Sequence, residues 1–501
     1  MPAARCRRAP AASAPVFTGR GAESGSWFVQ KHGMTDHLST PVKHYISACA
    51  IVALSIAALA WLWPREAKTP EERQALAEGR VIITYWDRHT GHEYEARKVL
   101  IDEFNRSQDR IYVRTVVIGS RIEKLLTAIA GGAPPDICSM GTTVLAQLAV
   151  QGCFTPLEDR MAECPYLEES DFFPHAWDMM CFDGHVWGIL TTMDTTCLLW
   201  NKAAFRRAGL DPERPPKTVA ELEEYAAKLT VRSATGVEQY GFIPWQPWDQ
   251  TFLWGVMFGG KWFDETTGLL RCADDPAIIR SLAWQQSFAV DPRARENPPF
   301  AVDPARTSQG RLGGAYQSAN NPFYSGKVAM ITEGEWQCTF IPKYAPELDW
   351  GVATVPQPEG VPPVCNSQDG VADAVPSGSR HPEEAWAFLK WFYSPRPDGR
   401  PSPVSDYCKL IHNIPPRHEE AKQERFIDDP KFGVFVRQLF DRPAASFPAT
   451  PAAQFLSDVM QEQREQLVYH AITPEQAAVN IERATNAEIR AAWKLAGRSA
   501  P

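Results

Sequence analysis

Short apolar strands alternate with amphipathic helices from residue 81 onward, and this alternation restricts the possible folds more than any other feature. Strand-like runs at 81–86 and 111–118 are each followed by a helical stretch, at 95–105 and 121–132. In those stretches, apolar residues recur every three to four positions. Strands that alternate with helices form βα units. The sequence therefore predicts an α/β fold with mostly parallel sheets.

The same alternation continues along the chain of 501 residues, which is long enough for two or three domains. Further strands are expected at 136–140, 187–192, 197–201, 328–332 and 349–356, and further helices at 145–152, 220–229 and 381–393. Two helix starts carry the capping-box spacing, Thr218 with Glu221 and Thr473 with Gln476.

The N-terminal segment is expected to lie outside this fold. Residues 1–44 are rich in small and basic residues without periodicity, which indicates a disordered n-region, and Met34 is an alternative start. The run 45–63 has 19 residues without a charge, enough to cross a bilayer. It predicts a signal peptide or an uncleaved transmembrane anchor. With either one, the body of the chain is exported.

Composition limits the partners and the chemistry. The net charge is −9 with no basic block, which argues against nucleic acid as a partner. The chain has 17 tryptophans, whose flat rings suit ring-shaped ligands. Cys6 and Cys49 precede the body, so 9 of the 11 cysteines remain (11 − 2) and at least one is a free thiol. The sequence does not assign a disulfide pairing.

The stretch YWDRHTGHE (85–93) resembles a metal site at first sight, because it contains His89, His92 and Glu93. Its order is His-x-x-His-Glu, whereas zinc proteases have His-Glu-x-x-His. Thr90 and Glu93 have capping-box spacing instead and predict a helix that begins near residue 91. We therefore expect no metal here.

Residues directly after the predicted strands are the first candidates for ligand contacts. In open α/β sheets, ligands bind beyond the carboxyl ends of the strands. Trp86 and Asp87 end the first strand, and His92 follows as a donor at the rim. Thr142 and Thr143 follow the strand at 136–140 in the same way.

The stretch 245–263 is dense in aromatic residues. Trp245 and Trp248 flank a proline next to Asp249 on a non-helical segment. Aromatic faces beside a carboxylate are typical of sugar-binding clefts, because rings stack on C–H patches while acids accept from hydroxyls. We include both tryptophans among the expected ligand contacts.

A glycoside-active enzyme is a weaker alternative. Glu333 and Glu335 lie two positions apart, and either could act with Asp194. Such enzymes need two carboxyls about 5–10 Å apart across a sugar. Acidic residues can meet that spacing by chance, so the pattern alone carries little weight.

Four motifs in order resemble the family 1 extracellular solute-binding proteins. They begin with CFDGHVWGILTTMDTTCLLWNKAAFRRAGLDPERPPKTVAELEEYAAKL (181–229) and NPFYSGKVAMITEGEW (321–336). VPSGSRHPEEAWAFLKWFYSP (375–395) and IPPRHEEA (414–421) follow. The resemblance covers roughly residues 80–492. Trp200 stands where members usually have Tyr, which is a mild departure.

The resemblance implies a two-lobed periplasmic-binding-protein-like α/β fold (type II) with a three-crossing hinge. The first lobe would comprise 80–192 plus 356–413, and the second 193–355 plus 414–497. The crossings would fall near Thr192–Asp194, Val355–Pro358 and Asn413–Arg417.

The family pattern also implies ligand contacts in this chain. Trp336 matches the Trp that ends the family's Gly-x-Trp motif and stacks on a sugar ring in sugar-binding members. Asp194 occupies a position where members often place a carboxylate facing the cleft. Asp369 lies before the returning strand of the first lobe, and Arg417 lies in the third crossing.

The resemblance implies an exported sugar- or oligosaccharide-binding component of an ABC importer. We expect a monomer that binds carbohydrate and permease subunits, has no catalytic residue, cofactor or metal, and meets the membrane through its N-terminal segment. Two alternatives keep the fold. One is a different solute, such as a polyamine, phosphate ester, iron or thiamine, and the other is a tethered sensor.

Overall fold

The computed structural model describes residues 68–247, 250–264, 266–307, 318–367, 369–447 and 449–497. The predicted n-region, the apolar run 45–63 and Trp248 therefore lie outside the described residues. The first described helix, α2 (Pro70–Ala77), begins with a capping box between Thr69 and Glu72. Within the described ranges, no helix has both the length and the apolar character that a membrane crossing requires.

One five-stranded sheet has the order β2-β1-β3-β13-β6. Its strands are β1 (Val81–Asp87), β2 (Ile111–Val117), β3 (Ile137–Gly141), β6 (Ile189–Met193) and β13 (Gly370–Ala374). The strand β1 pairs in parallel with β2 and β3, whereas β13 is antiparallel to both β3 and β6. The prediction of a mostly parallel sheet is thus wrong for β13. That strand returns from the other sheet, not through a local crossover helix, so no βα unit sets its direction.

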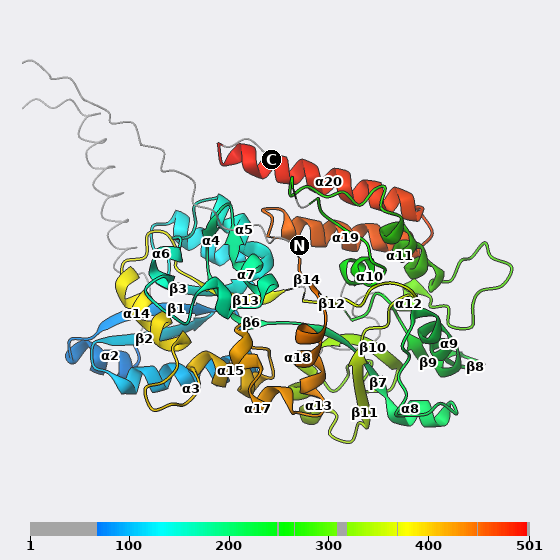
Figure 1. Cartoon of the computed structure of the whole chain (residues 1–501), viewed down its shortest axis with the longest axis horizontal. Helices are drawn as coiled ribbons and strands as arrows, with labels where there is room; N and C mark the ends of the chain where they lie inside the picture. Colours follow the sequence, from blue (N-terminus) through cyan, green and yellow to red (C-terminus); the bar gives the residue numbers. More distant parts are fainter. Residues whose placement is uncertain are drawn as a thin grey trace, which may run out of the picture. The chain divides into compact units, whose positions relative to one another are not determined.

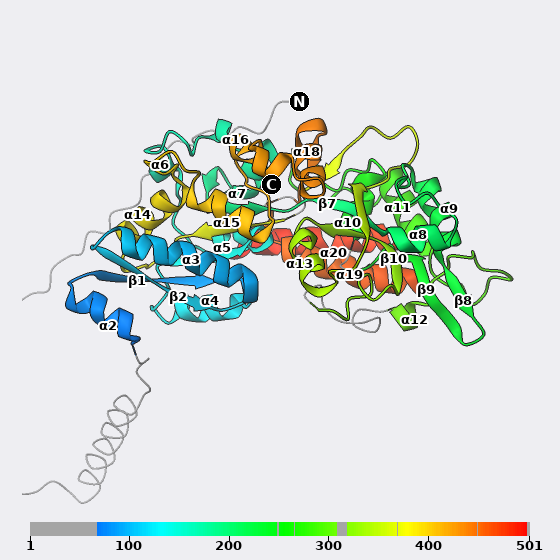
Figure 2. The same ribbon diagram turned by 90° about the horizontal axis from the view of Figure 1, so that it is seen from below.

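Helices cover this first sheet. They are α3 (Gly91–Ser107), α4 (Ile122–Ala130), α5 (Thr142–Val150), α7 (Pro174–Met180), α14 (Pro382–Tyr393) and α15 (Pro403–Ile411). Helix α3 packs on β2 and lies beside α15 (Figure 2), and α5 packs on β3 and β13. Between α5 and β6 lie the short elements α6 (Glu158–Met161), η1 (Glu169–Asp171), β4 (Cys181–Phe182) and β5 (His185–Val186).

The other five-stranded sheet has the order β11-β7-β10-β9-β8. Its strands are β7 (Thr196–Asn201), β8 (Val231–Ser233), β9 (Gly236–Phe242), β10 (Val328–Gly334) and β11 (Trp350–Thr354). Only the β9–β10 pair is parallel. Here too the expectation of a mostly parallel sheet is wrong, because β7 and β11 both run antiparallel to their neighbours.

Helices on and around the second sheet include α9 on β9 and α18 on β7 and β11. Their bounds are α8 (Lys202–Arg207), α9 (Val219–Leu229), α10 (Thr251–Met257), α11 (Pro276–Ser287), α12 (Pro304–Thr307), α13 (Gln337–Tyr344) and α18 (Phe432–Asp441). The short helices α16 (His418–Ala421) and α17 (Glu424–Ile427) precede α18 and contact the region of the first sheet, through His418 with Ser170 and through Arg425 with Asp406 of α15. The side chain of Thr218 caps α9 by accepting from the backbone N–H of Glu221, but the second bond of the predicted capping box is not formed, because Glu221 Oε2 accepts from the backbone N–H of Lys217 instead.

Two long helices, α19 (Ala453–Val468) and α20 (Pro474–Leu495), run side by side at the C-terminus (Figure 1). The predicted capping box of Thr473 and Gln476 opens α20, with both of its hydrogen bonds formed. These helices pack against α11 near the second sheet and also against α5 near the first. The C-terminal segment therefore contacts the structure around both sheets.

The chain passes between the sheets at three places. It leaves β6 at Met193 and enters β7 at Thr196, and it returns between Thr354 and Gly370. The third passage follows α15, where Ile414 pairs with Met193 as an isolated bridge. The two-lobed α/β fold is confirmed by this arrangement.

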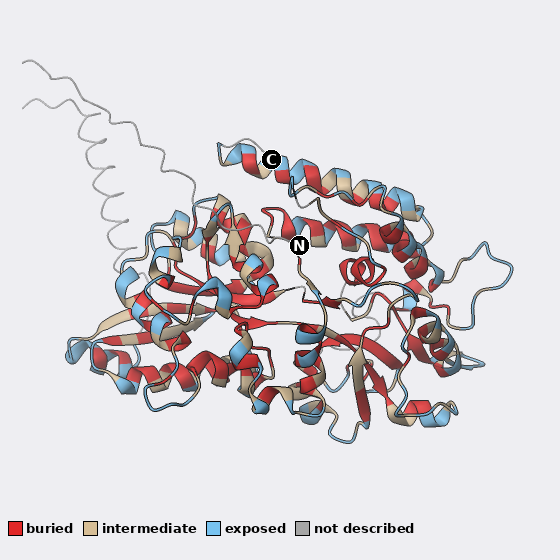
Figure 3. Cartoon of the chain, viewed as in Figure 1, coloured by how far each residue is buried: buried red, intermediate tan, exposed pale blue. Residues whose placement is uncertain are grey.

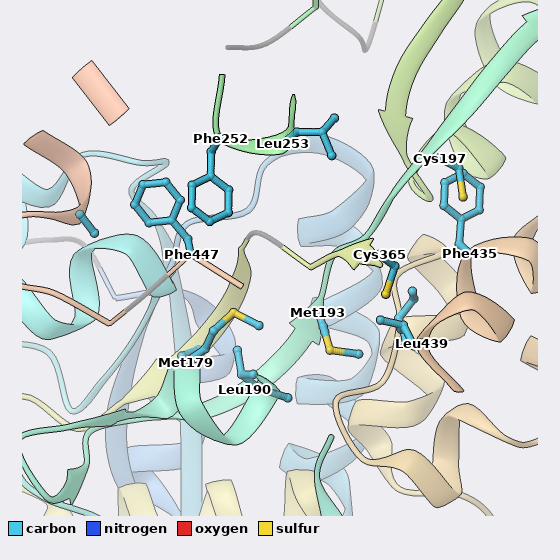
Figure 4. Close-up of a cluster of buried hydrophobic side chains, with 14 of the residues drawn as sticks. Met179, Leu190, Met193, Cys197, Phe252, Leu253, Cys365, Phe435, Leu439 and Phe447 are labelled. Atoms are coloured by element: carbon cyan, nitrogen blue, oxygen red, sulfur yellow. The ribbon is translucent and has the colours of Figure 1, made fainter. Parts of the chain in front are cut away.

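Apolar packing is continuous from one sheet to the other. Strands β3, β6, β7, β10 and β13 are buried along most of their length (Figure 3). Figure 4 shows a cluster beside the first passage, with Met193 of β6, Cys197 of β7, Phe252 of α10 and Leu439 of α18. A small parallel pair, β12 (Cys365–Asn366) with β14 (Ala444–Ala445), lies in the same region. The passages are thus anchored by buried side chains.

The nine cysteines of the body all fall within the described ranges, where none forms a disulfide, and seven of them are buried. Cys153, Cys164 and Cys181 are close enough in sequence for a local bridge, but the structure does not join them. Burial raises the pKa of the Cys153 thiol.

Candidate functional site

A cavity of about 470 Å³ lies where the strand ends of the first sheet face the second sheet and the passages between them. Cavities of about 300–1,000 Å³ are typical of small-molecule sites. It is lined from the first sheet by Arg88, His89, Thr90, Glu93, Gly119, Ser120, Asp369 and Val371. It is lined from the passages and the second sheet by Asp194, Thr196, Gln250, Trp336 and Asn413.

Most of the first-sheet lining comes from the loops that follow β1 and β2. Residues 88–90 follow β1, and Gly119 and Ser120 follow β2. Because these strands are parallel, their carboxyl ends lie at the same sheet edge, where α/β proteins bind ligands. The loop after β1 therefore lines the cavity, whereas the expected contacts Trp86 and Asp87 at the end of the strand do not.

Helix α3 begins at Gly91, as the spacing of Thr90 and Glu93 predicts, but the capping prediction is wrong. Thr90 occupies the N-cap position and makes no side-chain capping hydrogen bond. Both Thr90 and Glu93 line the cavity instead. The first turn of α3 therefore presents polar side chains to the cavity.

Trp336 supplies an aromatic surface in the cavity. It follows β10 directly, and its ring lies over Gly334, where an added β-carbon would be 2.1 Å from a ring carbon. The absence of a side chain at Gly334 lets the indole lie flat against the strand. Trp336 is half-buried and packs against the apolar core, so the ring is held in place.

Asp194 lies at the first passage between the sheets and lines the cavity. Asn413 Nδ2 donates to Asp194 Oδ1 at 2.8 Å and to Glu335 Oε1 at 3.1 Å. The backbone N–H of Thr195 donates to Glu335 Oε2 at 3.0 Å. Burial and the neighbouring charge of Asp369 raise the pKa of Asp194 to about 7. Burial and Asp194 raise the pKa of Glu335 well above its usual range.

Asp369 lines the cavity and is held by α5. Thr142 donates to Asp369 Oδ1 from its hydroxyl at 2.5 Å and from its backbone N–H at 3.1 Å. A β-carbon on Gly141 would be 3.0 Å from an Arg88 guanidinium nitrogen and 3.4 Å from an Asp369 oxygen. Because Gly141 has no side chain, the Arg88 guanidinium and the Asp369 carboxylate can both lie close to its backbone.

Asp87 lies behind the cavity, not in its lining. It is fully buried, with Ser139 Oγ and the His89 backbone N–H donating to Oδ1 at 3.0 and 2.9 Å. Its Oδ2 lies 3.3 Å from Nε of the buried Arg97. Burial raises the pKa of Asp87, but Arg97 and the hydrogen bonds from His89 outweigh it and hold the pKa near 2. The carboxylate is therefore ionised and internally paired.

Five other expected contacts also lie away from the cavity lining. Trp86 packs against the core, and Trp245 is 3% exposed within it. His92 is half-buried, with Nε2 3.1 Å from the carbonyl oxygen of Leu410. Thr142 and Thr143 belong to the first turn of α5, and Thr142 reaches the cavity only through Asp369.

Arg417 is engaged in ion pairing away from the cavity. Its guanidinium donates to both carboxylate oxygens of Glu420, at 3.1 and 2.6 Å, and to the carbonyl oxygen of Tyr166 at 3.1 Å. It is 5% exposed. A guanidinium with this many donors already used is not open to a solute in this conformation.

Of the residues expected from the sequence, the structure brings Asp194, Trp336 and Asp369 together at the cavity. Sequence reasoning missed Arg88, Gly119, Ser120, Thr196, Gln250, Val371 and Asn413, left His89 out of the expected contacts, and assigned Thr90 and Glu93 to capping. The usable signal was position, because Arg88 and Ser120 follow the ends of two strands that the apolar pattern predicts.

The lining combines one aromatic ring with both donors and acceptors. Arg88 and Asn413 can donate, and the carboxyls of Glu93, Asp194 and Asp369 can accept. The carboxyls of Glu93 and Asp369 outnumber the single guanidinium of Arg88 even when Asp194 keeps its proton, so the cavity has acidic character. Such a lining suits a polar, hydroxyl-rich solute better than a polyanion.

Residues 89–398 match the model of the bacterial extracellular solute-binding protein family. The chain belongs to this family. The match covers more than half of the chain and includes every strand of the two five-stranded sheets except β1. Family membership places the body of the protein outside the cytoplasm, and the relatives found are binding proteins.

A solved relative, CpMnBP1 with mannotriose bound, is 30% identical, with a TM-score of 0.71 over 81% of this chain and all of that chain. The sn-glycerol-3-phosphate-binding periplasmic protein UgpB of Agrobacterium fabrum is 26% identical over 72% of this chain and 81% of its own length. The sugar-binding protein MalE of Xanthomonas citri shares the fold, with a TM-score of 0.66 and 21% identity over 83% of this chain and 99% of its own.

Proposed function

We propose that this chain captures a sugar or oligosaccharide in the cavity between its lobes and delivers it to an ABC importer. The observation that carries the proposal is the placement of Trp336 beside Asp194 and Asp369 in one cavity. An indole ring can stack on the C–H face of a sugar while carboxylates accept hydrogen bonds from its hydroxyls. Arg88 and Asn413 supply donors to ring or hydroxyl oxygens.

A phosphate ester such as sn-glycerol-3-phosphate is the main alternative ligand, since a curated relative binds it. A phosphate dianion would meet the carboxyls of Glu93 and Asp369 against the single guanidinium of Arg88, and Asp194 adds a further negative charge above its pKa of about 7. Like charges at close range disfavour binding. This balance supports a neutral saccharide over a phosphorylated one.

Capture would proceed by closure of the lobes. The proposed lobes are 80–192 plus 356–413 and 193–355 plus 414–497, with C-terminal helices that contact both. A ligand that touches Arg88 on one side and Trp336 on the other gains both sets of contacts only when the lobes approach. It would therefore shift the open–closed equilibrium toward the closed form by its differential affinity. The closed form would dock on the permease.

Binding without turnover is the proposed chemistry. Glu333 is 1% exposed and accepts from Gln337 Nε2 at 3.1 Å, and Glu335 is fully buried. Neither glutamate lines the cavity, so the pair that a glycosidase would need around a sugar is not formed by these residues. Hydrolysis of a chromogenic glycoside that is lost in Asp194→Asn would favour the enzyme instead.

Isothermal titration tests the ligand class. The panel is mannobiose, mannotriose, maltotriose and sn-glycerol-3-phosphate, titrated into the body of the chain and into a Trp336→Ala variant. We expect saccharide binding that weakens at least tenfold without the indole, and no phosphate-ester binding. If the chain binds sn-glycerol-3-phosphate and none of the saccharides, the proposed sugar ligand is wrong and the phosphate ester is the ligand.

We also propose that the segment 45–63 exports the chain and either is cleaved or anchors it to the cytoplasmic membrane, and that the protein works as a monomer. Mass spectrometry of the mature N-terminus separates these two fates. A cleaved N-terminus supports a free carrier, and an intact one supports an anchored protein. Only an anchored protein keeps the tethered-sensor alternative open.

A further inference from the structure

His89 is the cavity residue with the most highly organised surroundings. It follows β1, lines the cavity, and is 9% exposed. Three side chains contact its Nδ1 atom: Asp87 Oδ1 at 3.2 Å, the Tyr407 hydroxyl at 3.1 Å and Arg97 Nη2 at 3.3 Å. These partners occupy one edge of the imidazole, behind the cavity wall.

The partners of His89 belong to a rigid buried cluster. Arg97 is 1% exposed, lies 4.4 Å from the ring centroid of Tyr407, and pairs with Asp87 and Asp373 at 3.3 and 3.4 Å. The rings of His89 and Tyr407 meet edge to face with centroids 5.8 Å apart. Packed and charge-paired side chains of this kind fix the rotamer of the group they hold.

The cluster also selects the tautomer of His89. Ionised Asp87 can only accept a hydrogen bond, so its contact with the ring at 3.2 Å favours a proton on Nδ1. Arg97 faces Asp87 and Asp373 through Nε and Nη1, while its Nη2 lies 3.3 Å from Nδ1 and is the one donor that opposes this tautomer. With Nδ1 protonated and directed at Asp87, the neutral ring keeps its lone pair on Nε2, at the other edge.

We propose that His89 binds the solute directly, with Nε2 accepting a hydrogen bond from a ligand hydroxyl, and that Asp87, Arg97 and Tyr407 act as its positioning residues. This inference rests on the proposed function, because it assigns a role within the same cavity. It predicts a preference for ligands that donate at this point. A hydroxyl satisfies Nε2, whereas an ether or methylated oxygen leaves the buried acceptor unpaired.

His92, in the first turn of α3 and three positions after His89, provides a matched control. Its Nε2 contacts the carbonyl oxygen of Leu410, and its side chain does not line the cavity. His89→Ala and His92→Ala therefore remove the same side-chain group from two nearby positions. Only His89 lines the cavity, so only its removal should affect binding.

Titration with mannotriose, or with whichever panel saccharide binds, compares the wild-type chain with His89→Ala, His89→Gln and His92→Ala. We expect His89→Ala to bind at least tenfold more weakly. His89→Gln should recover part of the loss, because its amide oxygen can accept in place of Nε2. His92→Ala should stay within about twofold of wild type. Thermal unfolding checks that each variant is folded.

Nitrogen NMR of histidine-labelled wild-type protein gives a readout that needs no substitution. We expect the Nδ1–H tautomer for His89 before ligand is added, and a shift of Nε2 when saccharide binds. An Nε2–H tautomer, or equal affinity of wild type and His89→Ala, would overturn the inference while leaving the proposed function intact. Failure of the wild-type chain to bind any saccharide would remove the proposed function, and this inference with it.

Discussion

Asp194 and Glu335 share one donor where the chain first passes between the two sheets, because Asn413 Nδ2 donates to Asp194 Oδ1 at 2.8 Å and to Glu335 Oε1 at 3.1 Å. Asp194 lies at the cavity and Glu335 is fully buried behind it. Two carboxyl groups in contact share a proton, because two adjacent negative charges in a buried place repel each other. The proposed hinge therefore contains a carboxylic acid that stays neutral near neutral pH.

This pair makes the folded protein less stable as the pH rises. The pKa of Asp194 is about 7 in the folded chain and 3.8 as the ordinary value, and the pKa of Glu335 is also raised. Between about pH 4 and 7 the folded state thus binds more protons than the unfolded state, so the free energy of unfolding decreases with pH. Asp194→Asn should reduce this slope, as measured by urea unfolding at pH 5 and pH 8.

The exposed Asp109, in the turn before β2, gives the control for that measurement. Asp109→Asn should leave the pH dependence as in the wild type. A wild-type slope in Asp194→Asn would show that the pair does not bind the extra proton.

Gly334→Ala should weaken saccharide binding although it removes no cavity side chain. A β-carbon there would be 2.1 Å from a ring carbon of Trp336, so the indole must move. We expect at least a tenfold loss of affinity in titration calorimetry and a loss of about 1–3 kcal/mol of stability from overpacking.

Gly351→Ala is the control for Gly334→Ala. A β-carbon at Gly351 would be 2.1 Å from the ring of Trp200, in the same sheet but outside the cavity lining. It should destabilise the protein by a similar amount and keep the affinity. Equal affinities in the two variants would contradict a role for the Trp336 ring position.

Thr142→Val should weaken binding through Asp369. The threonine hydroxyl donates to Asp369 Oδ1 at 2.5 Å, and hydrogen bonds to charged groups contribute about 1.5–3 kcal/mol. Without it, the carboxylate loses its fixed orientation, and we expect an affinity loss of about 5–10-fold by calorimetry. Thr142→Ser keeps the hydroxyl and should bind as the wild type does. A Ser variant as weak as the Val variant would point to lost packing of the methyl group.

Trp245→Ala should affect stability and not affinity. Trp245 is 3% exposed in the apolar core, and large-to-small changes of buried aromatic residues cost about 3–5 kcal/mol. We expect that loss in urea unfolding, with saccharide affinity within about twofold of wild type at a temperature where the variant is folded. A selective loss of affinity would return Trp245 to the ligand contacts.

The fold was largely predictable from local patterns. Runs such as 111–118 and 220–229 show the strand and helix periodicities clearly, and both elements form within a few residues of the expected bounds. The direction of β13 was not predictable. Its neighbours in the sheet come from residues more than 170 positions earlier, and local periodicity contains no information about such pairing.

The site was predictable in part. Trp336, Asp194 and Asp369 follow from family motifs and do line the cavity. Asp87 has the right position along the chain but the wrong orientation. Alternate residues of a strand point to opposite faces, and Asp87 turns inward to Arg97 with Tyr85 and Ile83 of the same face.

The sequence by itself determined the strand and helix segments, the aromatic and acidic residues near strand ends, and family membership. These features depend on local periodicity and on motifs along the chain. Only the tertiary structure decided which polar residues face the cavity and which form hydrogen bonds and ion pairs inside the protein. His89 and His92 differ by three positions in sequence, yet the buried charges of Asp87 and Arg97 hold one against the cavity, while the other contacts α15.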